Sequence, residues 1–401
     1  MIDYEKMISR TLSDIKPSGI RRFFDLLSEL DGVTALTVGQ PDFVTPWHIR
    51  EAAISSLEEG KTYYTSNAGI ADLRSAISGY MKRRFRLEYD AHEEIFVTVG
   101  GSEAIDVAIR SLVNPGDEVI LPTPSFVCYA PIAKMAGARV VEVATREEDG
   151  WRLTPEALRS AISNKTKLLI LPYPANPTGA VLRREELEAL AEVLRDTNVA
   201  VLSDEIYAEL TYGEGHVSIA EIDGMKERTV LVSGFSKAYA MTGWRLGYVC
   251  APAPLAKEML KLHQYAIMCA PTMSQFAAIE AMENGDGDVE YMRNEYNKRR
   301  ILIHDGLEKI GIPAYMPEGA FYVFARIKEL GLSSEEFCER LLYEHRCAIV
   351  PGTAFGEAGE GYARISYAYS EEHIKQALDR LSEFVAKLKK ENSLPRPEVK
   401  A

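Results

Sequence analysis

The segment GFSKAYAMTGWRLG (234–247) places a lysine among small and apolar residues. The amine of Lys237 could form an imine with an aldehyde, and Ser236 together with Arg245 could hold a phosphate group. Taken alone, a lysine is more often a solvated surface residue, and such a residue normally has polar neighbours. The small and apolar residues around Lys237 therefore favour a reactive lysine over a surface one.

A carboxylate ends a predicted strand elsewhere in the chain. The segment VAVLSDEIY (199–207) runs into Asp204, and Tyr207 follows three residues later. An aspartate at the end of a buried strand is costly unless it meets a cation, and a protonated pyridine nitrogen would be a suitable cation. The alternative interpretation is an aspartate that caps a helix or closes a turn.

Two further loops also follow predicted strands. In PYPANPTGA (172–180), prolines surround Asn176, which by itself predicts only a rigid turn. GGSEA (100–104) brings Gly101 and Ser102 to the start of a predicted helix, where exposed N–H groups suit a phosphate. Gly-Gly-Ser is equally an ordinary loop and helix cap, and it matches neither a Walker motif nor a dinucleotide fingerprint.

Three single residues could contact a ligand. Arg364 lies within the apolar segment YARISYA (362–368), either at a sheet edge or as a bidentate receptor for a carboxylate. Tyr129 follows a predicted strand and could stack on an aromatic ring, and Tyr64 sits among polar and small residues. In a chain with 20 tyrosines, either tyrosine alone would more often be a packing residue.

The elements that must position these residues alternate between β-branched runs and amphipathic helical patterns. This alternation predicts a mostly parallel sheet covered by helices on both faces. Ligands of such sheets bind beyond the carboxyl ends of the strands, where the loops above lie. The predicted strands are 94–99, 117–122, 138–143, 166–171, 199–204, 228–233 and 246–251, and the clearest helices are 102–113, 155–162 and 184–196.

After about residue 285 the pattern changes to that of a smaller α+β domain. A long helix is predicted over 288–310 and a closing helix over 371–390, with strands at 320–327, 347–352 and 362–368 between them. We therefore expect a large domain over 46–285 and a small domain made of 1–45 and 286–390. The polar, proline-bearing residues 391–401 predict a loose tail.

The composition of the chain limits the classes of function that it can have. The net charge of −13 disfavours nucleic acid and anionic membranes as partners, although a local basic pocket is still permitted. Five scattered cysteines without a C-x-x-C pair indicate reduced thiols in a cytoplasmic protein. The histidines form no H-x-x-x-H pair, so no metal site is expected. The chain shows neither a signal peptide nor a run of about 18 apolar residues.

Taken together, these loops are more specific than any one of them. The motifs PxNPTG, SDExY and SK-x-x-x-x-x-G-x-R-x-G, followed by a late R-I-S, resemble those of the class I/II aminotransferases of pyridoxal-phosphate fold type I. The resemblance runs from TVGQPDF (37–43) to YARISYA (362–368). It implies a seven-stranded, mostly parallel sheet with a smaller α+β domain, and pyridoxal 5'-phosphate as cofactor.

The resemblance also implies a role for each residue. Lys237 would carry the cofactor as a Schiff base and then shuttle a proton, and Asp204 would keep the pyridine nitrogen protonated. Tyr207 and Asn176 would bond the phenolic oxygen of the cofactor, and Tyr129 would stack on its ring. The remaining assignments are phosphate binding by Gly101, Ser102, Glu103, Ser236 and Arg245, a phosphate contact from Tyr64 of a neighbouring subunit in a homodimer, and a substrate carboxylate site made by Arg364 with Gly39 and Asn176.

Three residues depart from the family pattern. Gly234 stands where some relatives have a phosphate-binding serine, and Tyr173 stands where serine is frequent. Glu103 would repel a phosphate, so we expect its side chain to point away or only its backbone to contribute.

The resemblance leaves the substrate open. It implies transfer of an amino group from an L-amino acid, aromatic, aspartate-like or of broad type, to a 2-oxo acid such as 2-oxoglutarate. An N-acetyl-diaminopimelate aminotransferase and a carbon–sulfur lyase that uses the same cofactor are alternatives. Arg21 and Arg22 are candidate receptors for an acidic side chain, or surface residues. An effector-binding part of a transcription regulator and a Rossmann dehydrogenase are weaker alternatives; the dehydrogenase lacks its glycine fingerprint.

Overall fold

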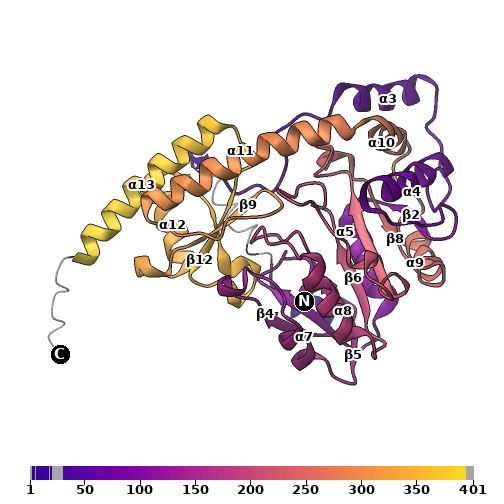
Figure 1. The fold of residues 1–401 in the computed structure, drawn as a ribbon, viewed down its shortest axis with the longest axis horizontal. Coiled ribbons are helices and arrows are strands. Elements are labelled where there is room, and N and C mark those ends of the chain that lie inside the picture. The colour runs from indigo at the N-terminus through magenta and orange to yellow at the C-terminus, as the bar shows by residue number, and fades with distance from the viewer. Residues whose placement is uncertain (1, 5, 18, 20–29, 394–401) are drawn as a thin grey trace.

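The computed structural model describes residues 2–4, 6–17, 19 and 30–393 of the 401-residue chain. Arg21 and Arg22 lie outside the described residues, as does the end of the predicted tail. Figure 1 shows a large sheet covered by helices, joined to a smaller unit that carries the last helices of the chain. Within the described ranges, no helix is both long and apolar enough to cross a membrane.

The large sheet has seven strands in the order β2-β8-β7-β6-β5-β3-β4, and only β8 runs antiparallel to its neighbours. Each strand lies within one residue of its predicted ends, so the predicted seven-stranded, mostly parallel sheet is confirmed. The strands are β2 (Ile95–Thr98), β3 (Glu118–Thr123), β4 (Arg139–Ala144), β5 (Thr166–Leu171), β6 (Ala200–Asp204), β7 (Thr229–Gly234) and β8 (Gly247–Cys250).

Helices cover both faces of this sheet, which explains why its central strands are apolar without alternation. One face packs against α5, α6 and α9, and the other against α7 and α8 at one end and α4 and α10 at the opposite end. These helices are α4 (Ala71–Phe85), α5 (Gly100–Leu112), α6 (Tyr129–Met135), α7 (Pro155–Ala161), α8 (Arg184–Leu194), α9 (Ala253–Ala266) and α10 (Thr272–Asn284), with α3 (Trp47–Glu58) packed on α10.

The smaller unit is built around a three-stranded antiparallel sheet in the order β11-β12-β9. The long helix α11 runs from α10, beside the large sheet, to α13 in the smaller unit (Figure 1). It ends at Gly311, whose left-handed backbone (φ +84°) suits a helix terminus. The elements are α11 (Asp286–Ile310), β9 (Tyr322–Arg326), α12 (Ser334–His345), β10 (Cys347–Ala348), β11 (Val350–Pro351), β12 (Tyr362–Ser366) and α13 (Glu371–Ser393).

Residues 34–36 also lie beside the smaller unit. The short strand β1 (Thr34–Ala35) pairs in parallel with β10, and Leu36 lies in the core that α11 and α13 share with β9. Before it, α1 (Arg10–Ser13) is the first helix described. The pairing of β1 with β10 supports grouping residues 34–36 with the smaller unit, whereas α1 contacts α6 of the large part. The division into residues 46–285 and residues 1–45 with 286–390 stays a prediction.

Two predictions about this unit were wrong in detail. Residues 347–352 form two short strands instead of one, because β10 pairs with β1 whereas β11 pairs with β12. The closing helix, predicted over 371–390, was predicted too short, because α13 continues through Ser393.

Candidate active site

A cavity of about 350 Å³ lies beyond the carboxyl ends of β5, β6 and β7, beside the start of α5. Residues of the large sheet line it together with residues of β9 and β12, so it sits between the two parts of the molecule. Most of the predicted site residues meet here: Gly39, Gly101, Ser102, Tyr129, Asn176, Asp204, Tyr207, Ser236, Lys237, Arg245 and Arg364.

Lys237 lies just beyond the end of β7, with its amine inside the cavity. Nζ donates a hydrogen bond to the carbonyl oxygen of Gly39 at 2.6 Å. Burial lowers the pKa of Lys237 to about 8, and the nearby charges of Arg364 and Arg245 act in the same direction. A much larger share of the amine is therefore neutral, and nucleophilic, than at a surface lysine.

Asp204 is the last residue of β6 and is buried. Oδ2 accepts a hydrogen bond from the Tyr129 hydroxyl at 2.7 Å, and Oδ1 accepts one from the backbone N–H of Ile206 at 3.1 Å. Burial raises the pKa of Asp204, and both hydrogen bonds oppose that rise. Both donors are neutral groups, so the carboxylate is suited to receive a cationic ligand group from the cavity.

A cradle for an anion forms where α5 begins. The helix starts at Gly100, and Gly101, Ser102, Ser236 and Arg245 all line the cavity. Gly100 has φ +76°, and a Cβ there would lie 2.6 Å from Nη2 of Arg245. Glycine at this position therefore lets the guanidinium approach the free N–H groups of the helix, an arrangement that binds phosphate.

Glu103 points away from this cradle, as expected. One carboxylate oxygen accepts a hydrogen bond from the backbone N–H of Val99, and the other lies 2.5 Å from Nδ1 of His263. Its side chain is engaged by these two partners and does not line the cavity, so only its backbone could contribute there.

Arg364 stands on β12 and is buried. Nη1 donates to Oδ1 of Asn176 at 3.0 Å and Nη2 donates to the carbonyl oxygen of Thr37 at 2.6 Å. Its Nε–H has no partner among the described residues. An arginine held in this way has donor capacity left for a carboxylate.

Several residues that line the cavity were missed by sequence reasoning. The most informative is Tyr322 on β9, whose hydroxyl lies 2.8 Å from that of Tyr207 and whose ring centre lies 4.5 Å from the guanidinium carbon of Arg364. No local signal distinguishes it among 20 tyrosines. The other residues missed are Thr37, Val38, Ile105, Phe126, Pro172, Pro174, Ile206 and Thr242.

Tyr64 is the one predicted site residue, apart from Glu103, that does not line the cavity. It lies between α3 and α4, and 78% of its surface is exposed. Tyr173, which had no assigned role, is buried in the core: its hydroxyl donates to the carbonyl of Trp151 and accepts from the N–H of Leu153. Close packing explains why residue 234 is a glycine and not a serine, because a Cβ there would lie 2.9 Å from the Cα of Gly247.

The cavity thus combines a buried amine, a buried carboxylate, an anion cradle at a helix start and a carboxylate-binding arginine, on a mostly parallel sheet. An aldehyde, a basic ring nitrogen and a phosphate on one small molecule would meet all of the first three features. Fold and site together define a pyridoxal-phosphate enzyme of fold type I.

Comparisons with known proteins identify the family within that class. The model of the family "Aminotransferase class I and II" matches residues 31–381. The chain is 52% identical over 380 residues to Putative aminotransferase YugH of Bacillus subtilis, covering 95% of this chain and 98% of that one. It is 45% identical over 383 residues to Probable N-acetyl-LL-diaminopimelate aminotransferase of the same organism, covering 96% and 97%.

A solved structure shares the fold over nearly the whole chain. It is the aromatic aminotransferase from Pyrococcus horikoshii, with a TM-score of 0.88, 43% identity, and coverage of 92% of this chain and 99% of that one. The chain belongs to the class I and II aminotransferase family. The predicted fold type, the cofactor pyridoxal 5'-phosphate and the aminotransferase activity are thereby confirmed, and the dehydrogenase and regulator alternatives are excluded.

Proposed function

We propose that Lys237 is the residue that holds the cofactor and then moves the proton at the substrate Cα. The observation that carries this proposal is the lowered pKa of its amine, about 8, inside a cavity that also holds Asp204, Arg245 and Arg364. The bound cofactor supplies an electron-withdrawing ring that stabilises negative charge at the substrate Cα. With the cofactor bound, Lys237 would be the base that takes the proton from that carbon.

The other residues bind and orient. Asp204 would hold the ring nitrogen in its protonated form, Tyr129 would lie against the ring, and Asn176 and Tyr207 would donate hydrogen bonds to its phenolic oxygen. Gly101, Ser102, Ser236 and Arg245 hold the phosphate, with the backbone of Glu103. Arg364 binds the substrate α-carboxylate, assisted by Gly39 and Asn176, which turns a loose encounter into an oriented one. The cavity that brings these side chains together supports the assignments.

For the amino donor, we propose an L-amino acid with an aromatic or other largely apolar side chain, and a 2-oxo acid such as 2-oxoglutarate as acceptor. Apolar side chains of Val38, Ile105, Phe126 and Ile206 line the cavity. Within the part of the chain that the structure describes, the only arginines lining it are Arg245 and Arg364, both already assigned. Aspartate-like donors and N-acetyl-diaminopimelate are the alternatives that a substrate panel would decide.

We propose further that the active unit is a homodimer in which Tyr64 reaches the phosphate site of the neighbouring subunit. Its high exposure, next to Tyr63, which is also exposed, supports a role outside its own cavity. We also propose a cytoplasmic location, which the free state of all five cysteines supports.

Substitution of the two central residues tests these roles. Lys237→Ala should abolish transamination while the protein still folds, and Arg364→Lys should raise the KM for amino acid and 2-oxo acid far more than it lowers kcat. The carbon–sulfur lyase alternative predicts instead that cystathionine releases pyruvate and that amino acids undergo no transamination. Wild-type activity in the Lys237→Ala enzyme would contradict the proposal.

A further inference from the structure

Two segments from the two parts of the molecule meet beside the cavity. One is the loop over 172–183 that carries Asn176, and the other is the segment over 313–319 that leads into β9. The backbone N–H groups of Glu318 and Gly319 both donate to the carbonyl oxygen of Gly179 at 2.8 Å. Gly179 has φ +72°, and a Cβ there would lie 2.3 Å from the Cβ of Pro317. The two backbones therefore approach as closely as only glycine permits.

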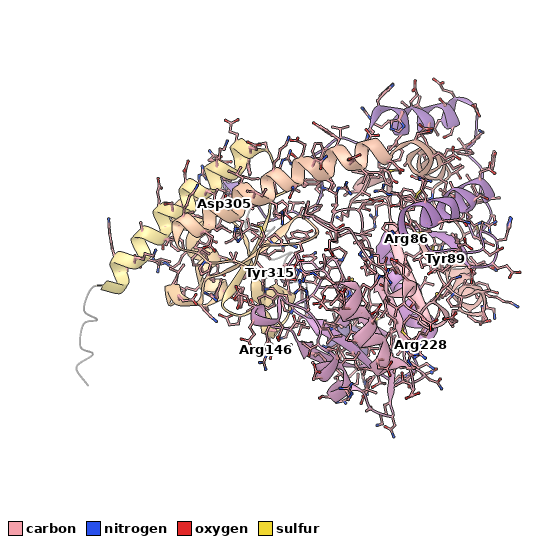
Figure 2. All side chains as sticks on the ribbon, in the orientation of Figure 1. Arg86, Tyr89, Arg146, Arg228, Asp305 and Tyr315 are labelled. Atoms are coloured by element: carbon pink, nitrogen blue, oxygen red, sulfur yellow. The ribbon has the colours of Figure 1, made fainter. Side chains whose placement is uncertain are left out.

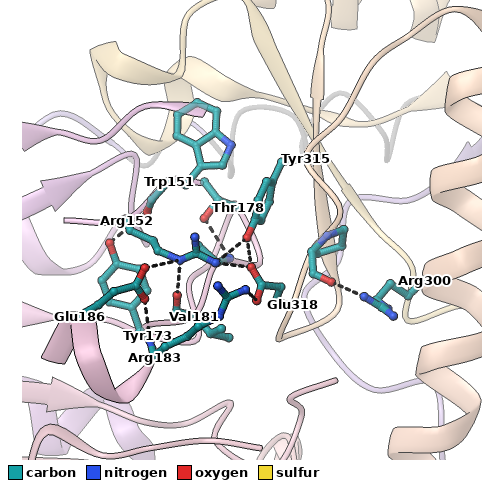
Figure 3. Close-up of polar contacts among 12 residues, drawn as sticks. Trp151, Arg152, Tyr173, Thr178, Val181, Arg183, Glu186, Arg300, Tyr315 and Glu318 are labelled. Atoms are coloured by element: carbon teal, nitrogen blue, oxygen red, sulfur yellow. Dashed lines mark hydrogen bonds and ion pairs between the residues drawn. The ribbon is translucent and has the colours of Figure 1, made fainter. Parts of the chain in front are cut away.

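A cluster of ion pairs and hydrogen bonds connects the two segments at this junction (Figure 3). The guanidinium of Arg152 donates from Nη2 to a carboxylate oxygen of Glu318 and from Nε to the carbonyl oxygen of Val181 at 3.0 Å. Arg183 pairs with the second oxygen of Glu318 at 3.0 Å. Tyr315, which Figure 2 shows between the two parts of the molecule, donates its hydroxyl to Glu318 and accepts from Arg152 at 3.1 Å.

The central pair is well shielded from water. The Arg152 side chain is 15% exposed and that of Glu318 is 24% exposed. Fully exposed ion pairs contribute little because solvent screens them and their side chains lose freedom. Arg152 and Glu318 are instead held by several partners each. Arg152 also lies 3.4 Å from a carboxylate oxygen of Glu186, and Glu318 also pairs with Arg183 at 3.0 Å. Loss of either residue therefore removes contacts from a partly buried network.

The junction is connected to the substrate carboxylate site on both sides. Asn176 lies three residues before Gly179, and its Oδ1 accepts from Arg364. Tyr322 lies four residues after Glu318, and its ring packs on the guanidinium of Arg364. Strands β9 and β12 pair directly, with Phe324 opposite Arg364. A shift at the junction would therefore change the position of Arg364 relative to Asn176.

We propose that Arg152 and Glu318 are a positioning pair for the substrate carboxylate site. The pair holds the strands that carry Tyr322 and Arg364 in register with the loop that carries Asn176. Neither residue lines the cavity, so the pair acts through the backbone junction and touches neither substrate nor cofactor. The proposal rests on the role proposed above for Arg364.

Glu318→Gln and Arg152→Met test the pair. Both changes should raise the KM for the amino acid and the 2-oxo acid about tenfold, since a small misplacement of a clamp weakens binding strongly, while kcat falls less than threefold. The dissociation constant of 3-phenylpropionate, an unreactive carboxylate, should rise by a similar factor, measured by titration of the cofactor absorbance. The affinity for pyridoxal phosphate and the position of its absorbance band should stay at the wild-type values.

The pair Arg184 and Glu221 provides a matched control. Arg184 follows Arg183 in the chain, and its Nη2 lies 2.8 Å from Oε2 of Glu221. The side chain of Glu221 is only 10% exposed. Glu221→Gln should lower thermal stability without changing either KM. An equal rise of KM in this control would show a general loss of stability and overturn the proposal.

A double-mutant cycle separates a shared function from two unrelated ones. The Arg152→Met, Glu318→Gln double variant should show no greater KM than the more affected single variant, because both remove the same contact. Multiplicative effects would overturn the proposal, as would wild-type KM values in both single variants of an active enzyme. An inactive wild type, or an Arg364→Lys variant with unchanged KM, would instead contradict the proposed function.

Discussion

Lys237 owes its reactivity to the cavity around it and not to any neighbour that takes its proton. Burial lowers the pKa of its amine from the ordinary value of 10.5 to about 8, because the charged form loses hydration. The direction matters: a base with a lowered pKa is neutral, and nucleophilic, at a lower pH than usual.

The rate of cofactor attachment should therefore titrate with Lys237. We expect the rate at which the apo-protein takes up pyridoxal phosphate to rise with pH and to level off above a midpoint near 8, followed by visible absorbance. Free Nα-acetyl-lysine, treated in the same way, is the control and should titrate near 10.5. A midpoint near 10.5 in the protein would contradict a buried, desolvated amine.

The hydrogen bond from Tyr129 should set the acid limit of activity. It opposes the rise that burial imposes on the pKa of Asp204, so Tyr129→Phe should raise that pKa further. A hydrogen bond to a charged group contributes about 1.5–3 kcal/mol, which corresponds to an acid limb displaced by at least one pH unit. The pH profile of kcat should move to higher pH on its acid side only. An unchanged acid limb would show that Asp204 does not control activity.

The sequence predicts the residues at strand ends better than those brought in by pairing. Asp204 ends a strand, and Lys237 and Asn176 lie in loops that follow strands, where the topology of a parallel sheet places functional residues. Tyr322 reaches the site only because β9 pairs with β12 in one register, and a single sequence does not contain that register. Phe126 and Val38 were missed because they are apolar residues without a local signal.

At the scale of elements, a network of buried hydrogen bonds around Glu205 holds β6, the strand that carries Asp204. Glu205 accepts hydrogen bonds from Ser203 at 2.8 Å and Ser218 at 2.6 Å, and lies 2.8 Å from Nε2 of His216. The side chains of Glu205 and His216 are both almost fully buried. The network therefore fixes the end of β6, from which Asp204 points into the cavity.

Removing His216 should destabilise the fold more than an ordinary surface substitution. His216→Ala would leave the Glu205 carboxylate buried with fewer partners, and we expect a loss of about 2–4 kcal/mol in the free energy of unfolding. Urea denaturation followed by circular dichroism would measure it. His92→Ala, at an exposed histidine, serves as the control and should change stability by less than about 0.5 kcal/mol. An equally small effect at His216 would refute the anchoring role.

The helices and strands show the same difference: some are marked by the local sequence, and others depend on residues elsewhere in the chain. The seven strands of the large sheet were predicted within a residue because apolar β-branched runs and turn residues mark their ends. Residues 347–352 were predicted as one strand because they are uniformly apolar. Whether Cys347 and Val350 join one sheet or two depends on their partners, Thr34 near the start of the chain for Cys347 and Arg364 for Val350, and the segment itself does not encode that pairing.

At the scale of the whole molecule, the prediction that two subunits share their active sites rests on Tyr64. If it acts in the neighbouring subunit, a hybrid dimer of a Lys237→Ala chain and a Tyr64→Ala chain contains one intact site. Co-expressed chains should therefore regain up to about one quarter of the wild-type sites, although each variant alone is impaired. The hybrid dimer is purified through different tags on the two chains, and its activity is then measured. A hybrid no more active than the mean of its parents would show that Tyr64 does not act across the interface.

The most direct test of the central claim is the visible absorption spectrum of the purified protein before and after addition of amino acids. Wild-type protein loaded with pyridoxal phosphate should be yellow, should lose that band with glutamate or an aromatic donor, and should regain it with the matching 2-oxo acid. Lys237→Ala should lack the band of the covalently held cofactor. A wild-type protein that takes up no cofactor, or whose spectrum matches that of Lys237→Ala, would contradict the assignment of Lys237.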